Sequence, residues 1–190
     1  MNKFIHLRGG SGSGKTSTVK SFLSRGDYKL KYIIIDSKKY PYMVDEKQEI
    51  ICTGRYKEND CGGLDGVIES TSIMQKYLWK IMKDLKPKII VFEAVMYGKT
   101  FKFGYELHCI CRKLGYKYIG VLLQPTLEQV FENISNRNYG KPINEDYIQS
   151  GYFTNFSATK KLRENGVFCA IENSRDYKKD ELYKVIEKYV

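Results

Sequence analysis

The sequence predicts an α/β fold with three layers, in which helices cover both faces of a five-stranded parallel sheet. Three observations predict it: short β-branched runs that end in polar residues, helical apolar periods between those runs, and a glycine-rich loop after the first run. Alternating strands and helices are typical of parallel sheets, because a parallel crossover usually takes a helix. A length of 190 residues fits one domain of ordinary size. We therefore expect a single domain over residues 1–190.

The five expected strands are short and apolar. Continuous runs of β-branched residues are typical of strands buried on both faces, and the runs 31–36 and 88–93 each end in a carboxylate. The carboxyl ends of parallel strands meet at one edge of the sheet, where ligands bind in this fold class. The expected strands cover residues 4–8, 31–36, 88–93, 116–123 and 167–171.

Segments whose apolar residues recur at helical spacing lie between these strands. One expected helix directly follows the glycine-rich loop, and two more cover residues 67–85 and 126–135. A last helix, at 180–189, is expected to cover the sheet. Two stretches do not fit the alternation, and such insertions often carry recognition residues or lids. We predict a substrate-binding insert around residues 37–65 and a lid around residues 126–165.

The glycine-rich loop predicts a phosphate-binding site. It reads Gly9-x-x-x-x-Gly14-Lys15-Thr16 and lies between an expected strand and an expected helix. Glycines let successive backbone N–H groups point at an anion, Lys15 adds a charge that reaches the β- and γ-phosphates of ATP or GTP, and the Thr16 hydroxyl is a ligand for Mg²⁺. The expected nucleotide-binding residues are Gly10, Ser11, Gly12, Ser13, Gly14, Lys15, Thr16 and Ser17.

Two carboxylates and one arginine are the candidates for phosphoryl-transfer chemistry. Glu93 ends its strand where a magnesium-holding acid is expected. Asp36 ends another strand, and an acid there can accept the proton of an acceptor hydroxyl. The sequence favours Asp36 as this base and leaves Glu93 as its competitor. Arg137 precedes a polar segment and is predicted to close onto the transferring phosphoryl group, with Lys15 completing the catalytic set.

A second glycine-rich segment is the candidate acceptor site. Arg55 could grip a phosphate, Tyr56 could stack on a base, and Gly62-Gly63 after Cys61 would permit close backbone approach. A plain turn is the alternative, since Gly-Gly also marks turns.

Composition points to an anionic partner. The formal net charge is +10, which attracts nucleic acid or nucleotides, although a solvated lysine-rich surface explains the same composition. No apolar run approaches the roughly 20 residues of a membrane span, and no signal peptide is evident. We expect a cytoplasmic protein with reduced thiols and no membrane partner. The oligomeric state is left open.

With these motifs in place, the chain resembles the P-loop nucleotide and polynucleotide kinases, and within them the phage-type 5-hydroxymethyluracil DNA kinases. The resemblance rests on the phosphate loop, Gly54-Arg55-Tyr56 with Cys61-Gly62-Gly63, Phe92-Glu93-Ala94, and residues 124–128 leading into Arg137. It implies the three-layer kinase fold with a helical lid, ATP and Mg²⁺ as cofactors, and a hydroxyl acceptor on a nucleotide or on nucleic acid, with DNA favoured.

Other functions stay open at this point. One alternative is a kinase for free nucleosides or nucleoside monophosphates, and another phosphorylates polynucleotide 5′-hydroxyls. A nucleotide-dependent switch without transfer chemistry is a third, although the Asn-Lys-x-Asp motif of regulatory GTPases is missing from the sequence.

Overall fold

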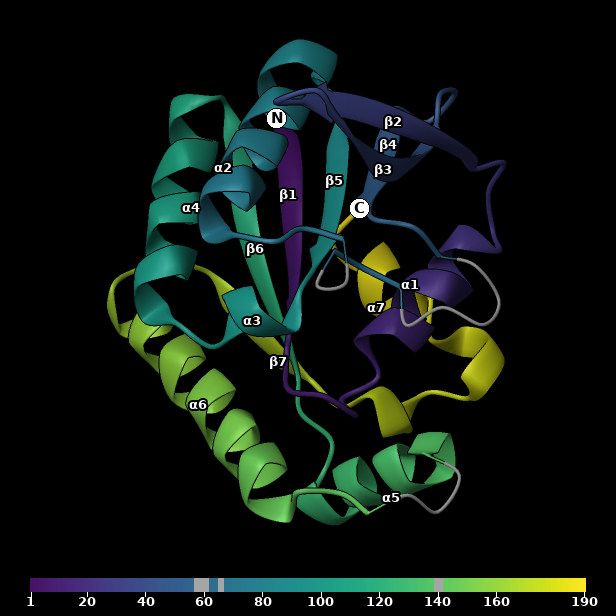
Figure 1. The fold of residues 1–190 in the computed structure, drawn as a ribbon, viewed down its shortest axis with the longest axis vertical. Helices are drawn as coiled ribbons and strands as arrows, with labels where there is room; N and C mark the ends of the chain where they lie inside the picture. Colours follow the sequence, from purple (N-terminus) through teal and green to yellow (C-terminus); the bar gives the residue numbers. More distant parts are fainter. Residues whose placement is uncertain (57–61, 65–66, 139–141) are drawn as a thin grey trace.

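The computed structural model describes residues 1–56, 62–64, 67–138 and 142–190 (Figure 1). Within these residues one sheet has seven strands in the order β2-β3-β4-β5-β1-β6-β7. The strands are β1 (Asn2–Arg8), β2 (Lys29–Ile35), β3 (Lys38–Asp45), β4 (Ile50–Thr53), β5 (Ile89–Glu93), β6 (Tyr116–Leu123) and β7 (Cys169–Glu172). The α-helices are α1 (Lys15–Leu23), α2 (Thr71–Lys80), α3 (Val95–Gly98), α4 (Phe101–Lys113), α5 (Leu127–Asn138), α6 (Glu145–Glu164) and α7 (Lys184–Glu187). The π-helical turn η1 (Ile81–Leu85) extends α2, and the 3₁₀ turns η2 (Ser174–Asp176) and η3 (Lys179–Glu181) follow β7.

The sheet is mixed, so the prediction of an α/β fold is confirmed but the five-stranded sheet is corrected. Strands β4, β5, β1, β6 and β7 pair in parallel. Strand β3 pairs antiparallel with both β2 and β4. The fifth parallel strand is therefore β4, and the expected strand at 31–36 corresponds to β2 at the edge of the sheet.

A two-residue turn explains why β2 was misplaced. Asp36 and Ser37 have φ values of 47° and 66°, the left-handed conformation that a tight hairpin requires. Ile35 pairs with Lys38 across this turn. The apolar run of β2 resembles a buried strand, but side chains on one of its faces are exposed: Leu30, Tyr32 and Ile34. The predicted insert at 37–65 consequently contains two strands, β3 and β4.

Helices cover both faces of the sheet, as predicted (Figure 1). One buried cluster joins residues of α2, α4 and α6 to the sheet, and a second joins residues of α1 and α7 to the other face. Strand β1 lies between β5 and β6, and its alternating side chains enter both clusters: Phe4 the first, Ile5 and Leu7 the second. Such central placement requires the apolar run that the sequence shows.

The expected lid is largely a core helix. Helix α6 has 20 residues, begins at the cap Asn144, whose side chain accepts a hydrogen bond from the backbone N–H of Tyr147, and buries Leu162 in the first cluster. The expected lid region also includes α5, and residues 139–141 of that region lie outside the described residues. The expected helix at 180–189 is shorter than predicted, with four residues in α7, but Val185 and Ile186 are buried. No helix in the described ranges is long and apolar enough to cross a membrane.

Candidate active site

The phosphate loop connects β1 directly to α1. Gly9, Gly12 and Gly14 have φ values of 139°, 79° and 91°, which only glycine adopts without strain. A Cβ on Gly12 would lie 2.9 Å from the carbonyl oxygen of Val130 in α5, so the loop also needs glycine to fit beneath that helix. Gly14 is the N-cap of α1, and the N-terminus of a helix favours an anion.

Lys15 lies across the loop rather than in solvent. Its Nζ donates hydrogen bonds to the carbonyl oxygens of Gly9 and Gly10, both at 2.9 Å, and the side chain is buried. The ammonium group is therefore held beside the backbone that surrounds the predicted phosphate position.

Thr16 and Glu93 form a pair of hard oxygen donors. The Thr16 hydroxyl donates to the two carboxylate oxygens of Glu93 at 3.1 and 3.3 Å, and Glu93 is almost completely buried at the end of β5. No group of three or more His, Cys, Asp or Glu side chains suited to a metal occurs in the described part of the chain. Mg²⁺ is usually held by one or two carboxylates together with substrate phosphates and water. One hydroxyl and one buried carboxylate beside a phosphate loop fit that ion.

A cavity of about 990 Å³ opens over this pair. Its described lining includes seven of the eight expected nucleotide-binding residues, 11–17, whereas Gly10 packs against α6 with Tyr152 N 3.6 Å from its ideal Cβ position. Among the described residues, five basic side chains line the cavity: Lys15, Arg55, Arg137, Arg175 and Lys179. Glu93 is the one carboxylate among the described lining residues, so the cavity suits a polyanion.

Asp36 does not reach this cavity, which corrects its expected place in the crevice. It lies in the β2–β3 turn, and its carboxylate pairs with Lys76 of α2 at 2.6 Å on the exposed surface. It borders a separate hollow that includes Lys76 and Trp79. The physical reason is the hairpin: β2 is three strands away from the central β1–β5 pair, so its end does not meet the phosphate loop.

The second glycine-rich segment lies against the metal-compatible pair. Gly62 approaches Thr16, and Gly63 approaches Glu93. Tyr56 packs in the cluster around α1, and its hydroxyl donates to the carbonyl oxygen of Thr53 at 3.0 Å, so its ring is not presented for base stacking. Burial, followed by the nearby Glu93 carboxylate, raises the pKa of Tyr56 well above its usual value. Cys61 lies outside the described residues.

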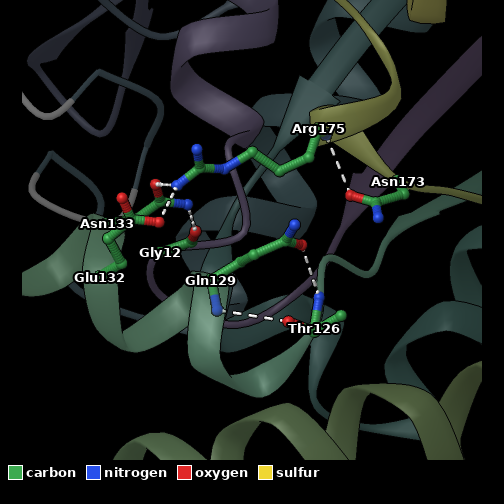
Figure 2. A network of polar contacts seen from close by, with 7 residues as sticks. All are labelled: Gly12, Thr126, Gln129, Glu132, Asn133, Asn173 and Arg175. Atoms are coloured by element: carbon green, nitrogen blue, oxygen red, sulfur yellow. Dashed lines mark hydrogen bonds and ion pairs between the residues drawn. The ribbon is translucent and has the colours of Figure 1, made fainter.

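Helix α5 contacts the phosphate loop through two side chains. Asn133 Nδ2 donates to the Gly12 carbonyl at 2.8 Å, as Figure 2 shows, and Arg137 Nη2 donates to the Ser11 hydroxyl at 3.2 Å. Arg137 is thus brought to the cavity as predicted, and its guanidinium lies beside the loop.

The segment after β7 completes the cavity wall and was not predicted. Arg175 Nη2 bonds to both Glu132 and Asn133 at 2.7 and 2.8 Å, joining η2 to α5 (Figure 2). Ser174 Oγ donates to the Ser13 carbonyl at 3.2 Å. These residues follow the carboxyl end of a parallel strand, and that position was the available signal.

Comparisons with known proteins agree with this geometry. No known protein family matches the chain. It is 28% identical over 144 residues to the 5-hmdU DNA kinase of Delftia phage PhiW-14, a match that covers 68% of the chain and 51% of that protein. The chain therefore spans about half the length of this curated relative. The resemblance predicted from the motifs is confirmed.

Two solved structures are similar in fold. A chain from the PezAT chromosomal toxin–antitoxin system of Streptococcus pneumoniae matches with a TM-score of 0.55 and 15% identity, covering 93% of this chain and 70% of that one. Deoxyadenosine kinase from M. mycoides with bound dCTP matches with a TM-score of 0.47 and 14% identity over 97% of both chains. At these identities the first match shows a shared fold alone.

Proposed function

We propose that the chain is a phosphotransferase that moves the γ-phosphoryl group of ATP to a hydroxyl group on nucleic acid, with 5-hydroxymethyluracil in DNA as the favoured acceptor. The observation that carries the proposal is the hydrogen bond from Thr16 to the buried Glu93 carboxylate, at a cavity lined by Lys15 and three arginines among the described residues. The identity to a phage protein named as a 5-hmdU DNA kinase supports this choice of acceptor.

The charged and loop residues of the cavity have proposed roles in the transfer. The loop N–H groups and Lys15 hold the β- and γ-phosphates, and Thr16 and Glu93 hold the cation. A bound Mg²⁺ supplies neutralisation of charge on the phosphate oxygens. Arg137, already 3.2 Å from Ser11, is placed to stabilise charge on the transferring group.

The proton of the acceptor needs a base. The acceptor oxygen forms a bond to the γ-phosphorus, the bond from that phosphorus to the β–γ bridging oxygen breaks, and ADP leaves. We propose Glu93, the one carboxylate in the described lining of the cavity, as the base, and in this role it holds the cation through water rather than directly. Arg55 lines the same cavity and is the proposed contact to an acceptor phosphate.

A labelling panel tests the proposal. The chain is incubated with Mg²⁺ and γ-labelled ATP or GTP against DNA containing 5-hydroxymethyluracil, unmodified DNA, RNA with 5′-hydroxyl ends, nucleosides and nucleoside monophosphates. The proposal expects label from ATP on the hydroxymethylated DNA. Label on 5′ ends or on free nucleotides alone would replace the acceptor with one of the two kinase alternatives. ATP binding without label on any acceptor would favour the switch protein.

A further inference from the structure

Three glycines bring the backbone of the second glycine-rich segment against the metal-compatible pair. Gly54, Gly62 and Gly63 have φ values of 103°, 66° and 70°. We call these three residues the glycine wall. A Cβ on Gly63 would lie 3.2 Å from Glu93 Oε1 and 3.3 Å from Glu93 Cγ. A Cβ on Gly62 would lie 2.7 Å from the Thr16 methyl carbon, Cγ2.

The first glycine supports the other two. A Cβ on Gly54 would lie only 2.4 Å from the Gly63 carbonyl oxygen, so the two backbone segments touch. Gly54 is itself fixed by a hydrogen bond from its N–H to the Pro41 carbonyl in β3 at 3.2 Å. The wall is therefore anchored to the sheet at one end and contacts Thr16 and Glu93 at the other.

Backbone conformation alone does not explain this wall. Gly115 and Gly166 have similar φ values of 79° and 75°, yet a Cβ on either one would meet nothing within 4 Å. At those two positions glycine serves a turn only. At Gly62 and Gly63 it also leaves room for the side chains that are proposed to hold the cation.

We propose that Gly63 is a positioning residue that sets the place of the Glu93 carboxylate and thereby the preference for Mg²⁺. This inference rests on the proposed nucleotide-binding function. Mg²⁺ requires near-ideal octahedral geometry at about 2.0–2.1 Å, whereas Ca²⁺ accepts longer and more varied bonds of about 2.3–2.6 Å. A methyl group at position 63 displaces a carboxylate that is buried and bonded to Thr16. Such a displacement should weaken the binding of Mg²⁺ more than the binding of Ca²⁺, because Mg²⁺ tolerates less deviation in its coordination geometry.

ATP affinity measured by titration calorimetry in EDTA, in Mg²⁺ and in Ca²⁺ tests the inference without turnover. Gly63→Ala is compared with Gly115→Ala, which adds the same methyl group at a similar φ in open space. Relative to this control, Gly63→Ala should bind ATP equally well in EDTA and lose about 10–100-fold of the gain that Mg²⁺ provides, as changes next to metal ligands do. The gain from Ca²⁺ should fall less.

A second pair of variants keeps the test decisive if Gly63→Ala does not fold. Gly62→Ala should also weaken the Mg²⁺ gain, because its methyl group meets Thr16 Cγ2 as well as the Tyr56 ring, each at 2.7 Å. Thr16→Ser keeps the hydroxyl and removes that carbon, so Gly62→Ala with Thr16→Ser should recover part of the gain. Equal Mg²⁺ gains in Gly63→Ala and Gly115→Ala, or equal losses with and without metal, would overturn the inference. A wild-type chain that binds no ATP would instead overturn the proposed function.

Discussion

Glu93 and Asp36 have opposite environments although each follows a strand. Glu93 is buried, bonded to Thr16 and located on the cavity wall, whereas Asp36 is exposed in a turn and paired with Lys76. When a buried carboxylate is removed, few neighbouring groups can take over its contacts. When an exposed carboxylate is removed, water readily solvates the partner that it leaves behind. Substitution of the two acids therefore separates a chemical role from a surface ion pair.

The amide substitution Glu93→Gln should lower kcat of transfer by about 10²–10⁴-fold, because it removes the proposed base and a proposed metal ligand. Asp36→Asn should change kcat by less than about two-fold. It should also lower the unfolding free energy by less than about 1 kcal/mol, since exposed ion pairs contribute little. Single-turnover rates with labelled ATP and urea unfolding measure the two effects. A large loss of rate in Asp36→Asn would contradict this assignment and indicate that Asp36 is the base.

His6 gives the fold an acid-sensitive position three residues before Gly9, where the phosphate loop begins. It is fully buried, and its Nδ1 lies 2.8 Å from the Tyr118 hydroxyl. Burial, followed by the positive charges of Arg8 and Lys15, lowers its pKa well below the ordinary value of 6.5. The unfolded chain then binds a proton that the folded chain does not, so stability is complete above pH 6.5 and falls as pH decreases below it.

The unfolding free energy should consequently decline below pH 6.5, with His6 contributing up to about 1.4 kcal/mol per pH unit. His6→Gln cannot take up this proton and should reduce the decline. Urea unfolding at several pH values from about 5 to 8 measures both slopes. Identical slopes for the two proteins would contradict the assignment to His6.

At the scale of elements, helix α5 is hydrogen-bonded to the phosphate loop. Asn133 and Arg137 each bond a loop residue, and Arg175 holds α5 to the segment after β7. The helix is thus connected to two sides of the cavity. The position of α5 should therefore change when a ligand binds in the cavity.

Arg137→Ala should reduce kcat by about 10²–10³-fold, the usual cost of losing one donor to developing charge. The matched control is Arg163→Ala, which removes an arginine from the exposed end of α6 and should leave the rate unchanged. Steady-state assays over a range of ATP concentrations separate kcat from KM. A change confined to KM would assign Arg137 to ground-state binding instead.

Helix α7 is short, so its contribution must come from packing. Val185 and Ile186 are completely buried in the cluster that includes α1. Ile186→Ala should destabilise the protein by about 2–5 kcal/mol through lost burial and an unfilled cavity. Lys184→Ala, on an exposed position of the same helix, should change stability by less than about 0.5 kcal/mol. Denaturant unfolding of both variants compares the two.

Elements with a local signal were predictable from the sequence, and elements defined by distant pairing were not. The phosphate loop and β5 carry residues that mark both their structure and their position. In contrast, β2 and β4 differ in which strand they pair with, and hydrophobicity does not encode that choice. Helix α6 was hidden because it carries exposed Tyr147, Phe153 and Phe156, which blur its apolar period.

The candidate site follows the same division. Lys15, Thr16 and Glu93 could be predicted because each belongs to a motif at a strand end. Ser174 and Arg175 belong to no motif, and their position after the end of β7, which pairs with β6, was their one signal in the sequence. The contact of Gly63 with Glu93 joins residues 30 positions apart through backbone geometry, which no sequence spacing predicts.

At the scale of the whole molecule, the net charge of +10 predicts how the acceptor is bound. Binding of single-stranded DNA should weaken with salt, with a log–log slope of about −0.7 for each phosphate that the protein neutralises. Fluorescence anisotropy of a labelled oligonucleotide between about 50 and 200 mM salt gives the slope. A nucleoside, which carries no phosphate, is the control and should show almost no slope. Salt-independent DNA binding would contradict an electrostatic interface.

The pairing of β1 has a consequence for the order in which this protein folds during synthesis. Phe4 pairs with Ile90 on one side and Tyr118 on the other, so the strand that carries the phosphate loop is made long before its neighbours. At about 5–20 residues per second, the ribosome delivers β6 many seconds after β1. During that interval the β2–β3 hairpin can form from local contacts, whereas the loop has no sheet to hold it. The proposed nucleotide site should therefore form late in translation, when β5 and β6 have joined β1 at the centre of the sheet.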